Sequence, residues 1–171
     1  MIHLSYHPAF DAFNSIFRFL RIRLNENISS IEVDKLRILD YYLLFPWRAA
    51  TIRLLQKDIG LRKVAKGLEA VQDYATLPSG ESLLERMRPS QTAALQTMAH
   101  DGVVDIRQLR NDVVQFTRLM PPEELIRRLN ERNQSEPDKM SIIRALNSYG
   151  LLGQDGLKGR TALLEHRYDK I

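Results

Sequence analysis

Histidines and carboxylates are the side chains best able to do chemistry in this sequence, and near the N-terminus they are regularly spaced. His3, His7 and Asp11 recur at intervals of four. On one continuous helix they would line a face suited to a two-histidine, one-carboxylate metal site. Pro8, however, fits the first position of a helix, which would leave His3 outside it. We therefore interpret His3 as solvated and expect no bound metal.

Groups for nucleophilic or acid–base catalysis do not form a recognisable motif. His100 stands beside Asp101, but no Gly-x-Ser-x-Gly turn presents a nucleophile. Adjacent carboxylates such as Glu123 and Glu124 fall where a helix is expected to begin, and acidic residues there interact favourably with the helix dipole. The sequence predicts a protein that is not an enzyme and that carries no cofactor.

A glycine-rich segment near the C-terminus is the one candidate phosphate loop. Its glycines at positions 153, 156 and 159 lack the spacing of a nucleotide-binding loop, and an expected strand follows the segment instead of a helix. Lys158 and Arg160 still place two cations on tight backbone, which suits contact with a phosphate backbone or with an acidic protein surface. The alternative interpretation is a solvated hairpin tip.

Basic residues are concentrated between positions 46 and 67. This stretch holds six cations and one acid, a net charge of +5, whereas the whole chain carries +4. The candidate contact residues in it are Arg48, Arg53, Lys57, Arg62 and Lys63. Their spacing fits a single helical face only loosely. Nucleic acid and an acidic groove on a partner protein are therefore both candidates for what this stretch binds.

The elements that must position these residues are mostly helices joined by short connections. A helix that begins at Pro8 is expected to carry a heavy apolar load on one face. That face comprises Phe10, Phe13, Phe17 and Leu20. It would either pack into the core of the protein or dock on a partner helix. Arg18 and Arg21 are expected on the opposite, polar face.

A second helix is expected from residue 29 to residue 45, and its sequence is apolar nearly all round. Such a helix should lie in the middle of a domain. Ser29 and Glu32 match a capping box that would start it. Asp40 interrupts the apolar surface and is expected to pair with an arginine. The candidate arginines are Arg18, Arg37 and Arg48.

The rest of the chain predicts further helices and a hairpin. The helices are expected on both sides of residue 60 and at residues 68–78, 82–87, 90–100, 105–119, 123–134 and 135–149. Strand-like runs at 151–152 and 161–164 flank the glycine-rich segment and predict a small C-terminal β-hairpin. A helix followed by such a hairpin is typical of a winged-helix unit. We expect a mainly α, multi-helix domain with winged-helix character, divided into residues 1–78 and 79–171 or forming one compact unit.

Composition excludes several classes of protein. The chain has no cysteine, which excludes thiolate metal sites, thiol nucleophiles and disulfide scaffolds. Its longest run without strongly polar residues, 41–47, is far shorter than the roughly 20 residues that span a bilayer. The N-terminal segment does not follow the pattern of a signal peptide. We expect a cytoplasmic protein with no membrane span.

Three stretches of the sequence resemble one family. They are Pro-Ala-Phe-Asp-Ala-Phe at residues 8–13, Leu-Asp-Tyr-Tyr-Leu-Leu-Phe-Pro at 39–46 and Gly-Leu-Lys-Gly-Arg-Thr-Ala-Leu at 156–163. They are similar to the middle component of bacterial three-component ABC-ATPase systems, the Lamassu-type anti-phage defence complexes, over almost the full chain. The resemblance implies a non-catalytic subunit of winged-helix character. Its implied partners are an SMC/Rad50-like ABC ATPase and an effector nuclease subunit, in a complex that senses foreign or plasmid DNA.

Two functional hypotheses follow. In the preferred one, the chain is an accessory subunit that bridges the ATPase and the nuclease, with its apolar helix against a partner and its basic segments near double-stranded DNA. In the alternative, it is a stand-alone winged-helix transcriptional regulator whose helix at residues 141–148 enters the major groove. Between Asp138 and Gly150 the only cations are Lys139 and Arg144, which is few for a recognition helix.

Overall fold

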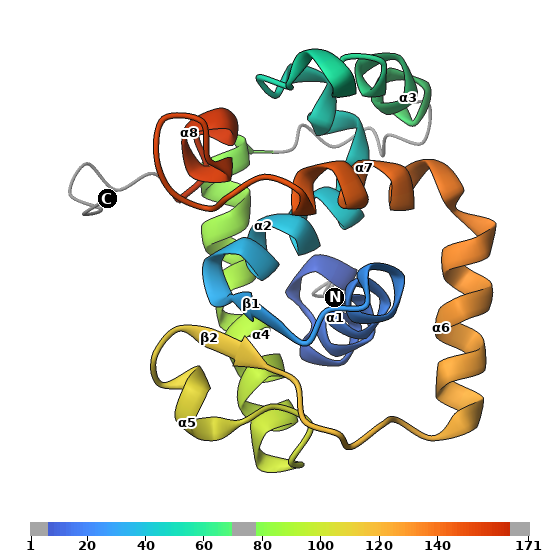
Figure 1. The fold of residues 1–171 in the computed structure, drawn as a ribbon, viewed down its shortest axis with the longest axis vertical. Coiled ribbons are helices and arrows are strands. Elements are labelled where there is room, and N and C mark those ends of the chain that lie inside the picture. The colour runs from blue at the N-terminus through green and yellow to red at the C-terminus, as the bar shows by residue number, and fades with distance from the viewer. Residues whose placement is uncertain (1–6, 70–77, 165–171) are drawn as a thin grey trace, which may run out of the picture.

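The computed structural model describes residues 7–69 and 78–164. These residues form helices packed around one hydrophobic core, with one small antiparallel sheet (Figure 1). The prediction of a mainly α fold is confirmed. The longer helices are α1 (Ala12–Glu26), α2 (Val33–Leu44), α4 (Gly80–His100), α6 (Glu123–Ser135) and α7 (Pro137–Asn147). The shorter ones are η1 (Pro8–Phe10), η2 (Pro46–Thr51), η3 (Gln56–Asp58), α3 (Leu61–Gly67), α5 (Ile106–Leu109) and α8 (Leu157–Thr161).

Helix α1 lies at the centre, surrounded by the other long helices. Figure 1 looks along it, with α2, α4, α6 and α7 around it, and it contacts all four. Asp11 starts α1 by accepting a hydrogen bond from the backbone N–H of Asn14 at 2.8 Å. Because neighbours lie on several sides, α1 buries consecutive residues from Arg18 to Arg23. The prediction that Arg18 and Arg21 lie on a polar, outward face is therefore wrong.

The sheet joins two segments that are far apart in the sequence. Strand β1 (Ser30–Glu32) pairs with β2 (Val113–Gln115), with Ile31 opposite Val114. The expected capping box at Ser29 does not form, because residues 30–32 are extended and α2 begins at Val33 with no side-chain cap. Likewise, residues 105–119 do not form one helix. The single turn α5 ends before Asp112, whose positive φ of 59° turns the chain into β2.

The C-terminal β-hairpin is also absent from the described residues. Instead of two strands, residues 157–161 form the short helix α8, and the loop before it folds back so that the Leu157 N–H donates to the Gly150 carbonyl at 2.8 Å. Gly156 makes this close approach possible, since a Cβ there would lie 2.2 Å from the Leu152 carbonyl oxygen. The regulator hypothesis relied on this hairpin as its wing.

Two further expectations concern helix α4 and the segment before it. Pro89 lies inside α4 and does not divide it into two helices. Because Pro89 is exposed, water can reach the carbonyl that loses its helical partner. The helix expected at residues 68–78 falls largely outside the described residues. None of the helices in residues 7–69 and 78–164 has the length and hydropathy that a membrane crossing requires.

Candidate interaction surfaces

Three arginines of α1 are buried, and each binds a different element of the fold. Arg18 pairs with Asp40 of α2, as the sequence allowed. Arg21 donates to Asn133 at 2.8 Å and to Glu136 at 2.7 Å, next to the junction of α6 and α7. Burial lowers the pKa of Arg21, and Glu136 partly offsets this effect. These cations stabilise the helix arrangement and do not present charge to a partner.

Arg23, the third buried arginine of α1, contacts the segment that follows β2. Its guanidinium lies 4.6 Å from the ring centroid of Phe116, and Nη2 donates to the Thr117 carbonyl at 3.0 Å. Its Nη1 is buried and has no hydrogen-bond partner in the described part of the chain. Desolvation by burial lowers the pKa of Arg23. Arg23 therefore fixes the connection after β2 onto α1.

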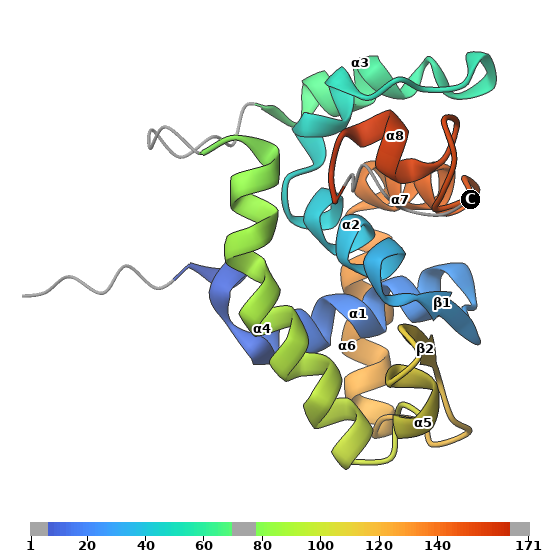
Figure 2. The ribbon, with the colours of Figure 1, turned by 90° about the vertical axis from the view of Figure 1, so that its left-hand side faces the viewer.

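The basic stretch of residues 46–67 divides into internal and external cations. Figure 2 shows η2 and α3 along one end of the molecule, above α7 and α8. Arg48 is half-buried and donates to the Tyr41 hydroxyl at 3.0 Å and to the Pro78 carbonyl at 2.8 Å. Arg53 is exposed but reaches Asp155 at 3.6 Å. These two arginines are at least partly engaged within the protein.

The remaining predicted cations of this stretch are exposed. Lys57, Arg62 and Lys63, which we call the basic edge, have no side-chain hydrogen bond or ion pair within residues 7–69 and 78–164. Lys57 and Arg144 of α7 also line one cavity of about 430 Å³ between this stretch and α7. Arg144 lies far from Lys57 in the sequence, so only the packing of α7 reveals that they border the same cavity.

The two cations of the glycine-rich segment lie inside the protein. Lys158 is 6% exposed and pairs with Asp34 of α2 at 3.0 Å. Arg160 is 8% exposed, donates to the Arg53 carbonyl at 2.6 Å and lies 5.0 Å from the ring centroid of Tyr149. They stabilise the packing of α8, so neither presents an unpaired cation to a phosphate or a partner.

The predicted apolar face of the first helix is divided between core and surface. Leu20 is 4% exposed and belongs to the core, whereas Phe17 is half-buried. Phe13 is 80% exposed and Phe10 is 40% exposed, with the Arg86 guanidinium 5.1 Å from the Phe10 ring centroid. We call Phe10 and Phe13 the aromatic corner. It is an exposed apolar site of the kind that proteins use for contacts.

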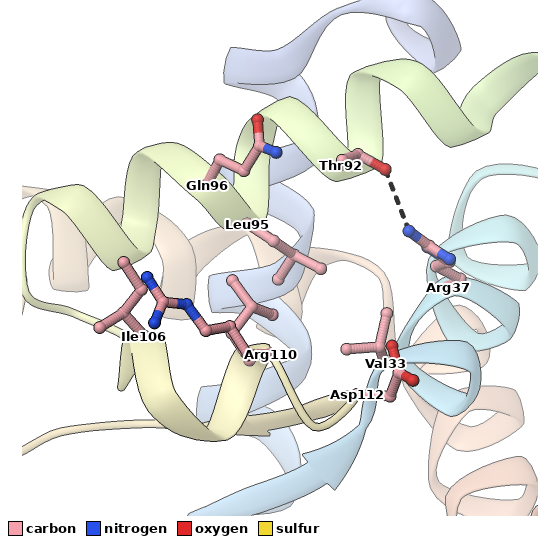
Figure 3. Close-up of a pocket in the computed structure, with 9 residues that line it drawn as sticks. Val33, Arg37, Thr92, Leu95, Gln96, Ile106, Arg110 and Asp112 are labelled. Carbon is pink, nitrogen blue, oxygen red and sulfur yellow. Dashed lines mark hydrogen bonds between the residues drawn. The ribbon is translucent and has the colours of Figure 1, made fainter.

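A further cavity lies between α2, α4 and α5 (Figure 3). Its volume is about 360 Å³. It is lined by Val33, Arg37, Thr92, Leu95, Gln96, Ile106, Leu109, Arg110 and Asp112. Figure 3 shows the two arginines at opposite ends of it, with aliphatic side chains between them. Sequence analysis did not identify Arg110 or this cavity, because the residues that line the cavity come from three separate segments of the chain.

The histidines have ordinary structural roles where they are described. His7 caps η1 by accepting from the Ala9 N–H at 3.1 Å, and its ring lies against Phe45. His100 is exposed beside Asp101. His3 lies outside the described residues. In the part of the chain that the structure describes, no three or more His, Asp or Glu side chains are grouped as metal ligands would be.

A family model spans all of these elements. The model of the ABC-three component (ABC-3C) system middle component 5 matches residues 4–169. The chain belongs to this family. The resemblance to middle components of three-component ABC systems is thus confirmed at the level of the family. Comparisons with curated proteins and with solved structures gave no match.

Membership of the middle component 5 family changes how the surfaces are interpreted. A component of a multi-component system is expected to contact other proteins, and such contacts favour exposed aromatic and arginine side chains. The aromatic corner and the cavity of Figure 3 offer these side chains, and the basic edge adds exposed cations. The buried arginines of α1 are excluded as contact residues because their guanidinium groups are engaged inside the fold.

Proposed function

We propose that this middle component is a non-catalytic accessory subunit that bridges an SMC/Rad50-like ABC ATPase and an effector nuclease. The complex would act in anti-phage and anti-plasmid defence of the Lamassu type. The observation that carries the proposal is the family match, which covers residues 4–169 and therefore every described element. The cytoplasm is the compartment in which such a complex would meet foreign DNA.

A bridging subunit needs at least two separate contact surfaces. The aromatic corner lies where η1 leads into α1, and the basic edge lies in η3 and α3. A partner that covers an exposed phenylalanine removes apolar surface from water, which stabilises the complex. Exposed cations instead favour contact with an acidic protein surface or with nucleic acid. The aromatic corner is therefore assigned to a protein partner.

The basic edge is assigned to double-stranded DNA near the complex, with Arg53 beside it. Unpaired cations on short helices suit phosphate contacts that do not depend on base sequence. Three such contacts give weak binding that salt abolishes, so DNA affinity would come from the whole complex. Lys158 and Arg160, which the sequence placed in the same role, are left out because both are buried.

Copurification from cells that express the neighbouring genes tests the proposal. The tagged chain is expected to retrieve a large ABC ATPase and a nuclease, and Phe13→Asp is expected to reduce that yield at least several-fold. Retrieval of neither protein would overturn the proposal.

Charge reversal tests the DNA contact in the assembled complex. The double variant Lys57→Glu/Lys63→Glu is expected to weaken binding of a short duplex and to lower the salt dependence of that binding. Arg107→Glu/Arg118→Glu is the matched control, because it changes the net charge equally at two exposed positions away from the basic edge. Equal effects of the two double variants would exclude a specific role for the basic edge.

A further inference from the structure

The cavity between α2, α4 and α5 has aliphatic walls. Leu95 and Val33 are buried at its base, while Ile106 on α5 is 51% exposed at its rim. A volume of about 360 Å³ lies at the lower end of the range for ligand pockets. The space therefore suits one aliphatic side chain with its neighbouring group better than a large cofactor.

Arg37 at one end of the cavity is held in place but incompletely satisfied. Its Nη2 donates to Thr92 of α4 at 3.0 Å, and its Nη1 lies 3.5 Å from Asp34. Asp34 is also the partner of Lys158, at the shorter distance of 3.0 Å. The Arg37 Nε is buried without a hydrogen-bond partner. Arg37 therefore keeps one buried N–H donor without an acceptor in the described residues, although Asp34 pairs with its guanidinium.

Arg110 at the other end is exposed and has no side-chain hydrogen bond or ion pair in the described residues. Asp112 is the one carboxylate among the residues that line the cavity. Two cations against one acid leave the lining positive. Because Arg37 already pairs with Asp34, an anionic group beside Arg110 would complement this charge.

The wall that carries Arg110 is fixed by local hydrogen bonds. Asp105 caps α5 by accepting from the backbone N–H groups of Arg107 at 2.7 Å and Gln108 at 3.1 Å. After α5, the Val33 N–H donates to the Asp112 carbonyl at 2.9 Å, which ties this wall to the start of α2. A preformed cavity lowers the entropic cost of binding.

We propose that this cavity is a docking site for an acidic segment of a partner subunit. In it, an aliphatic side chain of the partner sits against Leu95 and Ile106, and an adjacent carboxylate pairs with Arg110. The inference rests on the proposed function, because it assumes that this chain works in a complex. It adds to that function a specific site and the chemistry of the segment that fills it.

A titration of the chain alone tests the chemistry without any partner subunit. The probe is N-acetyl-Asp-Leu amide, and the readout is the set of backbone amide NMR signals of the ¹⁵N-labelled protein. Signals of Leu95, Ile106 and Arg110 are expected to shift on titration. N-acetyl-Asn-Leu amide, which lacks the charge, is expected to bind roughly fivefold more weakly. Equal binding of the two probes, or no binding, would overturn the proposal.

Variants at exposed positions localise the effect. Arg110→Glu is expected to abolish the preference for the aspartate probe. Arg107→Glu, three residues earlier in α5, is the control and should leave the preference unchanged, since Arg107 does not line the cavity. Unchanged thermal unfolding of both variants shows that neither acts by unfolding the chain. A short DNA duplex that shifts the same amide signals in place of the peptide would also overturn the proposal.

Copurification with the neighbouring gene products separates this inference from the proposed function. If the wild type retrieves its partners, Arg110→Glu is expected to lower the yield at least several-fold, and Arg107→Glu is not. If Arg110→Glu retrieves the partners at the wild-type yield, the docking site is overturned and the proposed function is retained. If no partner is retrieved and the dipeptide still binds with the expected preference, the proposed function fails and the acidic-segment site stands.

Discussion

Arg18 of α1 donates two hydrogen bonds to the carboxylate of Asp40 on α2, from Nε to Oδ1 at 2.5 Å and from Nη2 to Oδ2 at 3.1 Å. Both side chains are buried, and Gln91 of α4 donates to the same carboxylate at 2.8 Å. Helices α1, α2 and α4 are therefore joined by one buried polar network. Such a network stabilises the fold only while every charge in it is paired.

Removal of the carboxylate is expected to be strongly destabilising. Asp40→Ala leaves the Arg18 guanidinium buried without its counter-ion, which should lower the free energy of unfolding by about 3–5 kcal/mol. Urea denaturation measures this loss. Glu124→Ala is the control, since Glu124 pairs with Arg127 and Arg128 at the surface and should matter much less. Similar losses for the two variants would contradict this account of the network.

A double variant tests whether the stability at this site depends on the Arg18–Asp40 ion pair or on side chains that fill the same space. Arg18→Met/Asp40→Leu removes both ions together and leaves no uncompensated charge. Its free energy of unfolding is expected to exceed that of Asp40→Ala, because apolar replacements of a buried ion pair are often tolerated. A double variant as unstable as the single one would show that the hydrogen bonds to Ser15 and Gln91 carry the stability instead.

Two glycines near α8 make a matched pair for substitution. At Gly156 a new Cβ would lie 2.2 Å from the Leu152 carbonyl oxygen and 2.6 Å from that of Leu151, so the backbone would have to move. Gly156→Ala is expected to lower the free energy of unfolding by about 1–3 kcal/mol. Gly150→Ala meets nothing within 4 Å and should be nearly neutral. Thermal unfolding of the two variants distinguishes these effects.

Glu136 should make the protein acid-sensitive. Burial alone would raise the pKa of this carboxyl, but Lys139 and Arg21 outweigh burial, and the net pKa is below the usual 4.5. The unfolded chain therefore binds a proton at Glu136 more readily than the folded protein does. The resulting stabilisation is fully present above pH 4.5 and is lost as pH falls through the lower, folded-state pKa.

Denaturation midpoints recorded as a function of pH test this dependence. The wild type should lose stability below pH 4.5 more steeply than Glu136→Gln, which has no carboxyl to protonate at that position. The variant should also be less stable than the wild type at neutral pH, because Arg21 then lacks its ionic partner. Parallel curves for the two proteins would show that Glu136 does not contribute to the acid response.

Substitution of an exposed and of a buried phenylalanine of α1 should distinguish a residue that binds a partner from a residue that stabilises the fold. Phe13→Ser is expected to change the free energy of unfolding by less than about 0.5 kcal/mol, because Phe13 is 80% exposed. Phe19→Ala, inside the core, should cost about 3–5 kcal/mol. Partner retrieval should fall for Phe13→Ser although its stability is unchanged. Loss of stability in Phe13→Ser would contradict an exposed contact role.

Local sequence patterns predicted most helices but misplaced several of their ends. Pro122 and the two glutamates after it predicted the start of α6. The helix expected to begin at Pro8 begins instead at Ala12, because the chain first forms the short turn η1 and Asp11 then caps α1. Residues 105–119 show where this approach fails. Their apolar spacing fits a helix, yet Val113 and its neighbours gain more by pairing with β1, which lies far away in the sequence.

The sequence by itself determined the helical class, the family, the concentration of basic residues at 46–67 and the pairing of Asp40 with a nearby arginine. Each of these depends on residue types or on patterns within one segment. Only the tertiary structure decided which cations are external. Lys57 and Lys158 look alike in sequence, but Lys158 is buried and pairs with Asp34 of α2, whereas Lys57 is exposed. Exposure depends on the packing of distant segments, and local periodicity carries no information about that packing.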